Sequence, residues 1–375
     1  MLGSAVDAMH LWLRDGFGNP SGVHRHARAA RQALEESRDV VAAAIGAAAR
    51  EIVFTGGGSE ALNLAFAGSQ RKPDGASGTS EVVISAIEHD AVRNAAGALA
   101  LRDRAAVREL VVDARGVVDI ERAAAAVEPG TTLLAVMAVN NEVGTIQPVI
   151  ELIEIARRVA PGCVVVVDAV QALSWCDVRP ITAAADLIAF SAHKFGGPKG
   201  VGCLAVREGL TLTPIIYGGG QERDRRSGTQ NVAGIVAMAE AARVADATRS
   251  ERVDRVTRLR DRLVDGLLDA IPAASETSPR AAKVAGNAHL CIEGIESEEL
   301  LVLLDQSGIS ASAGSACASG AMHASPVLLA MGISKERALG SLRLSLGATT
   351  TDADVDLALE VVPACAARLL RVGAR

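Results

Sequence analysis

Short apolar runs rich in Val, Ile and Leu alternate with longer helical patterns along the first two thirds of the chain. Among these runs are VVIS, TTLLAVMAV, VVVV and LIAF, and small or polar residues follow each of them. Buried parallel strands carry continuous apolar runs because helices cover both faces of their sheet. Aromatic residues make up only 2% of the sequence, so we expect an aliphatic core. The alternation predicts a doubly wound α/β sheet.

A chain of 375 residues is long enough for two domains. We expect a large domain over residues 12–250 and a smaller α+β domain over 251–375, with the extreme N-terminus joining the smaller one. Helical patterns cover residues 23–49 and 232–270, and the arginines of the second are interpreted as a solvated face. The predicted strands of the large domain span residues 51–55, 82–85, 110–112, 131–139, 164–167 and 187–190, with 202–206 as an antiparallel return.

Charge and cysteine spacing exclude several classes of protein. The net charge is −6 with acids and bases interspersed, so neither a nucleic-acid surface nor a membrane surface is indicated. No apolar run approaches the roughly 18 residues of a membrane span, and the N-terminus lacks a secretory pattern. The six cysteines form no CxxC pair, which argues against a disulfide framework and a resident metal. We expect a cytoplasmic protein.

Two neighbouring strands are expected to deliver a carboxylate and an amine to the same edge of the sheet. Asp168 ends the run VVVV, and Lys194 lies in SAHKFGGPKG just after LIAF. Ligands of open α/β sheets bind outside the carboxyl ends of the strands. Pyridoxal phosphate needs a lysine for its Schiff base and an acid at its ring nitrogen. The pair therefore predicts this cofactor, although a lysine in a loop is more commonly a solvated surface charge.

The segment GGGSE joins a predicted strand to a helix and is a candidate phosphate site. Amides at a helix start bind anions, and glycine permits close approach. Such a segment is about as often an ordinary turn. Ser59, Ser191 and His193 are positioned to donate to one phosphate, which strengthens the phosphate interpretation.

Three further polar residues follow predicted strands. His89 in SAIEHD is a candidate for stacking on a planar ring and for proton transfer near neutral pH. Asn141 in NNEVGTIQP and Gln171 are candidates for binding a ring oxygen, and each is equally interpretable as a turn or helix cap.

Two residues in the last third of the chain are candidates for substrate chemistry. Cys317 lies in SASAGSACASGA, residues 310–321, where every other residue is Ser, Ala or Gly; this predicts a mobile loop with an exposed thiol. The alternative is a linker with an incidental cysteine. Arg343 in SLRLSLG points opposite to its leucine neighbours and either binds a carboxylate or lines a solvated strand.

With these residues assembled, the chain resembles the NifS/IscS-like cysteine desulfurases within the class V aminotransferases. The matching motifs occur in order from residue 17 to residue 347: FTGGGSEALN, SAIEHDAV, VNNEVGTIQP, VDAVQAL, SAHKFGGPKGVG, GGGQERDRRSGTQN, SAGSACASG and GSLRLSLG. The resemblance implies fold type I of the pyridoxal-phosphate enzymes, with a seven-stranded, mostly parallel sheet. It also implies a homodimer with sites at its interface.

The resemblance further implies roles for individual residues. Lys194 binds the cofactor and moves the substrate α-proton, His89 stacks on the ring as acid/base, and Cys317 attacks the sulfur of L-cysteine, leaving alanine and a persulfide. Arg343 and Asn141 bind substrate, and Cys317 is a possible transient Fe–S ligand. The cofactor-binding residues that it implies are Gly58, Ser59, His89, Asn141, Asp168, Gln171, Ser191, His193, Lys194 and, on the neighbouring subunit's phosphate, Thr229.

The family usually begins with a strand like YLDNAATT, and this chain starts just after it; GGGSE also stands where GATES is common. Two alternatives stay open: another class V lyase or aminotransferase, which needs no thiol on a loop, and a catalytically impaired sulfur-relay scaffold. The expected acceptor is a protein docking near the Cys317 loop, in Fe–S assembly, tRNA thiolation, cofactor biosynthesis or DNA phosphorothioation.

Overall fold

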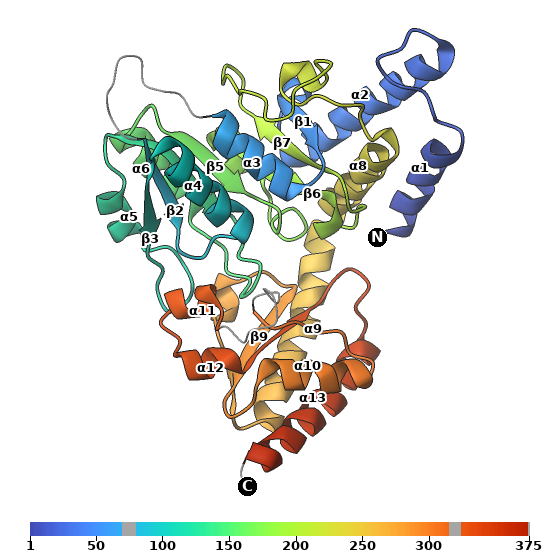
Figure 1. Cartoon of the computed structure of the whole chain (residues 1–375). Helices are drawn as coiled ribbons and strands as arrows, with labels where there is room; N and C mark the ends of the chain where they lie inside the picture. Colours follow the sequence, from blue (N-terminus) through green and yellow to red (C-terminus); the bar gives the residue numbers. More distant parts are fainter. Residues whose placement is uncertain (70–79, 315–323, 374–375) are drawn as a thin grey trace. The chain divides into compact units, whose positions relative to one another are not determined.

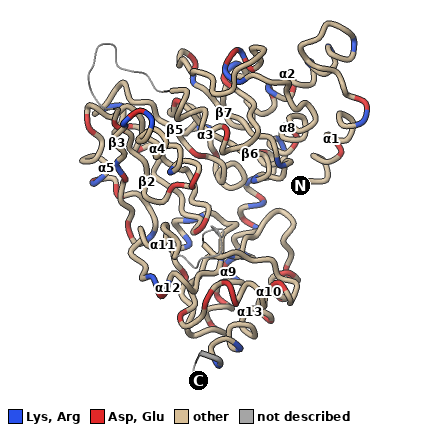
Figure 2. Tube along the Cα trace, in the orientation of Figure 1, with Lys and Arg blue, Asp and Glu red and all other residues tan. Residues whose placement is uncertain are grey.

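The structure, a computed structural model, describes residues 1–69, 80–314 and 324–373 (Figure 1). It contains two compact units. Unit 1 comprises Met1–Leu110, Ile120–Ala138 and Pro148–Arg249, and unit 2 comprises Val111–Asp119, Val139–Gln147 and Ser250–Arg375. None of the helices in these described ranges is both long and apolar enough to span a bilayer. Acidic and basic residues are interspersed along the trace of each unit (Figure 2).

Unit 1 is built on a seven-stranded sheet of order β1-β7-β6-β5-β4-β2-β3, which confirms the predicted α/β class. Strands β2 to β6 pair in parallel, whereas β7 runs antiparallel to β6 and β1. The strands are β1 (Ile52–Thr55), β2 (Glu81–Ser85), β3 (Ala106–Leu110), β4 (Thr131–Met137), β5 (Val164–Asp168), β6 (Leu187–Ser191) and β7 (Gly202–Val206).

The core of unit 1 is aliphatic, as the composition predicts. Helices α3 (Gly58–Gly68) and α4 (Asp90–Asp103) bury Leu62, Phe66 and Leu99 against alternate residues of the strands. The intervening strand residues are buried as well, and α6 (Val149–Val159) contacts β4 and β5. The other helices of unit 1 are α1 (Gly3–Arg14), α2 (Arg25–Ile45), α5 (Ile120–Ala126), α7 (Arg179–Ala184) and α8 (Val232–Ala247), with short 3-10 turns η1 (Ala49–Glu51), η2 (Ala192–Lys194) and η3 (Glu222–Asp224).

Unit 2 has a three-stranded antiparallel sheet of order β10-β9-β8. Its strands are β8 (Ala274–Glu276), β9 (Asn287–Ile292) and β10 (Ser341–Ser345). Its helices are α9 (Arg249–Ala270), α10 (Ser297–Gln306), α11 (Pro326–Ala330), α12 (Lys335–Leu339) and α13 (Asp352–Gly373), with the 3-10 turn η4 (Arg280–Ala282). Two segments from the middle of the chain, 111–119 and 139–147, also belong to this unit.

Several boundaries differ from the sequence-based expectations. The extreme N-terminus belongs to unit 1 because α1 packs on α8. Strand β3 ends at Leu110, where the predicted strand begins. The single helix expected over 232–270 is two helices, because the backbone leaves the helical conformation at Thr248, the C-cap of α8, where φ is −107° and ψ is 9°. Arg252 and Arg260 on α9 are buried rather than solvated.

Candidate active site

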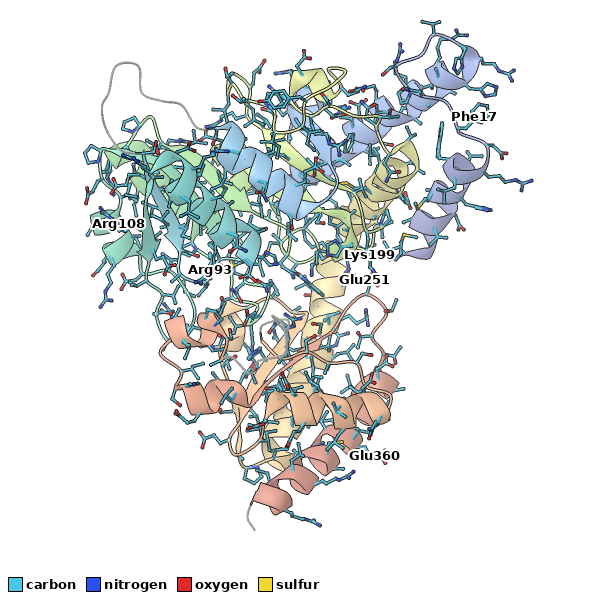
Figure 3. All side chains as sticks on the ribbon, viewed as in Figure 1. Phe17, Arg93, Arg108, Lys199, Glu251 and Glu360 are labelled. Atoms are coloured by element: carbon cyan, nitrogen blue, oxygen red, sulfur yellow. The ribbon has the colours of Figure 1, made fainter. Side chains whose placement is uncertain are left out.

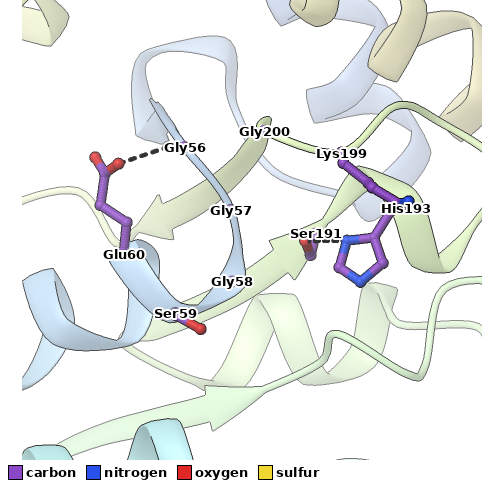
Figure 4. Close-up of a pocket in the computed structure, with 9 residues that line it drawn as sticks. All are labelled: Gly56, Gly57, Gly58, Ser59, Glu60, Ser191, His193, Lys199 and Gly200. Atoms are coloured by element: carbon purple, nitrogen blue, oxygen red, sulfur yellow. Dashed lines mark hydrogen bonds between the residues drawn. The ribbon is translucent and has the colours of Figure 1, made fainter.

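The start of α3 opens into a cavity of about 450 Å³ (Figure 4). Strand β1 leads into two glycines, and Gly57 has a φ of 150°, which a residue with a side chain rarely adopts. A Cβ atom on Gly58 would lie 2.7 Å from Val170 Cγ2, and one on Gly202 would lie 2.8 Å from Gly57 Cα. Glycine is therefore required for the backbone to pack this closely at the cavity wall, which is lined by Gly56, Gly57, Gly58, Ser59, Glu60, Ser191, His193, Lys199 and Gly200.

Four residues predicted for a phosphate, Gly58, Ser59, Ser191 and His193, thus lie around one cavity. Ser191 ends β6, and its Oγ lies 3.0 Å from His193 Nδ1. Partial burial, together with the charges of Lys194 and Lys199, lowers the pKa of His193. Hydroxyl groups, helix-start amides and a lysine are the donors that an anion requires. The donor set therefore fits a phosphate group.

Glu60 and Lys199 line the same cavity and were not identified from the sequence. Glu60 Oε2 accepts the Gly56 N–H at 2.7 Å, and Arg226 pairs with the Glu60 carboxylate at 2.8 Å. Arg226 offsets the negative charge that Glu60 brings to the cavity. Both residues belong to motifs noted from the sequence, GGGSE and GGPKG, and the charged residue in each motif was the available signal.

Asp168 ends β5 at the carboxyl edge of the sheet, where it is 6% exposed. Its Oδ1 accepts the Val170 N–H at 3.0 Å. Burial raises the pKa of Asp168, while the Val170 N–H, His89 and Lys194 act to lower it. The structure therefore brings the predicted acid within electrostatic range of the predicted lysine and histidine.

His89 caps the N-terminus of α4. Its Nδ1 accepts the Ala91 backbone N–H at 3.0 Å. A backbone N–H only donates, so Nδ1 carries a lone pair and the neutral ring holds its proton on Nε2. Because the side chain is exposed, Nε2 is the atom available for proton transfer.

Lys194 and Gln171 follow the two strands that end beside each other. Lys194 closes the turn η2 directly after β6, and its side chain is exposed. The Ser174 hydroxyl donates to the Lys194 carbonyl at 3.4 Å, joining η2 to the segment after β5. Gln171 lies half-buried three residues beyond Asp168.

Asn141 and Arg343, the predicted substrate-binding residues, are together in unit 2. Arg343 lies on β10, and its guanidinium donates to the Asn141 carbonyl at 2.7 Å. Ser312 bonds both main-chain groups of Arg343, at 3.2 and 2.7 Å. Burial lowers the pKa of Arg343, and Glu142 opposes the shift. Cys317 lies outside the described residues, and Thr229 is exposed in the segment before α8.

Glu88 is a buried acid that the sequence analysis missed. Its Oε1 accepts the Ser85 hydroxyl at 2.5 Å and the Met137 N–H at 2.8 Å. Its Oε2 has no hydrogen-bond partner among the described residues. Burial, reinforced by the charge of Asp168, raises the pKa of Glu88 to about 8. Glu88 is therefore protonated near neutral pH, and its place at a strand end directly before His89 was the available signal.

The five described cysteines are unpaired thiols. Burial raises the pKa of Cys163 and Cys203 to about 12, and that of Cys176 and Cys291 to about 11. Because the thiolate is the nucleophile, these four sulfurs are unreactive at neutral pH.

Comparison with known proteins identifies similar chains over nearly the whole length. Residues 2–358 match the family model described as aminotransferase class-V. An IscS-like cysteine desulfurase of Mycobacterium tuberculosis is 41% identical over 372 residues, 98% of this chain and 94% of that protein. A cysteine desulfurase IscS of Clostridium botulinum is 38% identical and covers 96% of this chain and 89% of its own. A solved NifS-like protein superposes with a TM-score of 0.90 at 33% identity, covering 97% of this chain and 95% of that one.

Proposed function

The chain belongs to the class V aminotransferase family, in its NifS/IscS-like cysteine desulfurase branch, and from this premise we propose that it desulfurates L-cysteine. The products are L-alanine and a persulfide on Cys317. One observation carries the proposal beyond the family match: Asp168 lies close enough to His89 and Lys194 for their charges to interact, at the carboxyl edge of a sheet where a cavity lined by hydroxyl, amide and lysine donors also opens.

Pyridoxal phosphate is the proposed cofactor. Gly58, Ser59, Ser191 and His193 would hold its phosphate, and the donors around the cavity support this assignment. Asp168 would pair with the ring nitrogen, Gln171 and Asn141 would face the ring oxygen, and Lys194 would bind the aldehyde. When bound, the cofactor supplies an electron sink for charge that develops at the substrate Cα.

The side chains of this protein bind the substrate, transfer the protons and accept the sulfur. Arg343 binds the substrate carboxylate, for which a guanidinium is the preferred partner. The Lys194 amine removes the proton from Cα. His89 donates or accepts a proton through Nε2, since Nδ1 is engaged with the Ala91 amide. The Cys317 thiolate attacks the substrate sulfur, and a new S–S bond forms as the C–S bond breaks with its electron pair moving to the β-carbon. One proton is then delivered to the β-carbon and another is returned to Cα, which gives alanine.

A homodimer is proposed, with Thr229 of each subunit reaching the phosphate of the other. Exposed apolar side chains on unit 1 support an interface: Phe17 is 76% exposed in the connection between α1 and α2 (Figure 3). Leu11, Leu13, Val23 and Tyr217 are likewise more than half exposed. Sedimentation analysis of the purified chain tests this, and a monomer at micromolar concentration contradicts it.

The sulfur acceptor is proposed to be a protein, either a scaffold for Fe–S assembly or a thiolation enzyme, that docks near the Cys317 loop. The unpaired thiols support a reducing compartment, the cytoplasm.

The deciding experiment supplies L-cysteine and a thiol reductant to the purified protein with pyridoxal phosphate, and it measures alanine and the sulfide that the reductant releases from the persulfide. We expect both products from the wild type, and loss of both from Lys194→Ala together with its visible cofactor absorption. Cys317→Ser should abolish persulfide and sulfide formation, while Cys365→Ser serves as the matched control and keeps both. Full sulfide release from Cys317→Ser would contradict the persulfide role and favour a class V lyase.

A further inference from the structure

Three consecutive residues with side chains adopt the left-handed backbone conformation in the segment between β7 and α8. Glu222, Arg223 and Asp224 have φ angles of 49°, 57° and 63°. Residues other than glycine visit this region singly, and a run of three is strained. Such strain persists only where the surrounding structure enforces it, and it concentrates at functional sites.

Hydrogen bonds to the Glu222 carboxylate hold this left-handed turn in place. The residue is 5% exposed, and Arg38, which is 2% exposed on α2, donates to both its oxygens at 2.7 and 3.0 Å. The Phe54 N–H donates to the same carboxylate at 2.9 Å, which ties it to β1. Arg38 also donates to the Ile52 carbonyl at 2.9 Å and lies 4.7 Å above the Phe54 ring. Hydrogen bonds to Ile52 and Phe54 thus attach the left-handed turn to β1, an edge strand of the sheet.

The same carboxylate organises the residues that follow. Gln230 donates to Glu222 at 3.2 Å, and the Gly228 N–H donates to Gln221 at 2.8 Å. Thr229 lies between these two fastened neighbours, and its own side chain is exposed. The strained turn and its hydrogen bonds therefore hold the residues on either side of Thr229 in place, while the Thr229 side chain is exposed.

We propose that the buried Arg38–Glu222 pair is a positioning device that presents Thr229 to the phosphate of the partner subunit, so that its effect is felt in the neighbouring site. This inference rests on the proposed function, which assigns Thr229 that role. It goes further because it names the two residues that order the segment and predicts that they act in trans.

Mixed dimers in which only one of the two subunits keeps Lys194 can distinguish this positioning role in the partner's site from a purely structural role within the same subunit. In the trans arrangement, a subunit carrying Lys194→Ala and Glu222→Gln pairs with a wild-type subunit, so the intact lysine site receives Thr229 from the altered segment. In the cis arrangement, Lys194→Ala pairs with a subunit carrying Glu222→Gln, so the lysine site receives an unaltered Thr229. Cofactor affinity is measured by titrating the visible absorption of the lysine-bound cofactor, with no substrate present.

In the trans dimer the cofactor phosphate should lose its hydrogen bond from the Thr229 hydroxyl. Because this bond is made to a charged group, we expect the cofactor affinity of the trans dimer to fall by about tenfold or more. The cis dimer should match the reference dimer of Lys194→Ala with wild type. Glu240→Gln, which breaks the exposed pair with Arg243, is the matched control and should have no effect in either arrangement. Equal affinity in the cis and trans dimers, whether both weakened or both unchanged, overturns the proposal.

Glu222→Gln could prevent folding because it leaves Arg38 without its buried partner. In that case the double variant Arg38→Met with Glu222→Met, which removes both charges together, replaces Glu222→Gln in the mixed dimers. The same trans-only weakening is expected. A reference dimer that binds no cofactor would instead overturn the proposed function, so the two failures are distinguishable.

Discussion

Replacing Glu88 by Gln should make the protein more stable at pH 8 and leave it nearly unchanged at pH 5. Gln has the shape of the protonated acid, and its carbonyl oxygen accepts from Ser85 and Met137 as Glu88 Oε1 does. Its amide nitrogen takes the place of Oε2, which has no partner among the described residues. The substitution therefore removes only the ability to ionise.

The sign and size of the effect follow from the pKa. Burial raises the pKa of Glu88 from 4.5 to about 8, so the folded protein binds this proton more tightly than the unfolded chain. The resulting stabilisation is complete below pH 4.5 and is lost as the pH rises through 8. A shift of one pKa unit corresponds to ~1.4 kcal/mol, so a shift of this size corresponds to ~5 kcal/mol in all and ~4 kcal/mol between pH 5 and 8. The Glu88→Gln variant loses none of this stabilisation as the pH rises, because its side chain cannot ionise.

Urea unfolding at pH 5, 6, 7 and 8 measures this difference. The free energy of unfolding of the variant minus that of wild type should rise with pH by ~1.4 kcal/mol per unit. Glu208→Gln is the control, because Glu208 is exposed and Arg50 lowers its pKa, so its difference should not rise. A difference for Glu88→Gln that is flat from pH 5 to 8 would refute the assignment of Glu88 as a buried neutral acid.

Arg343→Leu should raise the KM for L-cysteine ~100-fold with a smaller effect on kcat, as steady-state kinetics would measure, because a guanidinium–carboxylate pair is lost. Asp224→Gly should raise the free energy of unfolding by about 1 kcal/mol, since glycine relieves a φ of 63°; a lowered Tm would contradict this. Gly202→Ala should destabilise by ~2 kcal/mol or more in the same assay, because the new Cβ lies 2.5 Å from a backbone oxygen of β6. Cys163 and Cys203 should resist alkylation at pH 7.5 in native protein, and peptide mapping that finds either one labelled early would show that burial does not hold them as thiols.

Much of the candidate active site could be located from the sequence because its residues follow strands. An apolar run followed by a polar residue marks both the strand and its end, and Asp168, His89 and Lys194 all fit that pattern. The cavity proposed for a phosphate could be located for the same reason, since a glycine-rich turn between a strand and a helix exposes helix-start amides.

Other features depend on contacts that no local pattern encodes. Arg38 and Glu222 are 184 residues apart in the sequence, and neither stands out in its own segment. The segment 139–147 lies between strands of unit 1 yet belongs to unit 2, because Asn287 donates to the Glu142 carbonyl and Val284 to the Gly144 carbonyl. The strained turn at Glu222 could not be foreseen either, because it is held by its distant partners.

The sequence by itself determined the class of fold, the order of strands and helices, and the chemical groups delivered to the carboxyl edge of the sheet. Hydrophobic periodicity and glycine placement act over a few residues, so they can be interpreted without coordinates. Only the tertiary structure decided which acids are neutral and which charges are paired. Desolvation and ion pairing depend on everything packed around a group, and Glu88 and Glu222 each have neighbours from distant parts of the chain: Met137 and Asp168 for Glu88, and Arg38 for Glu222.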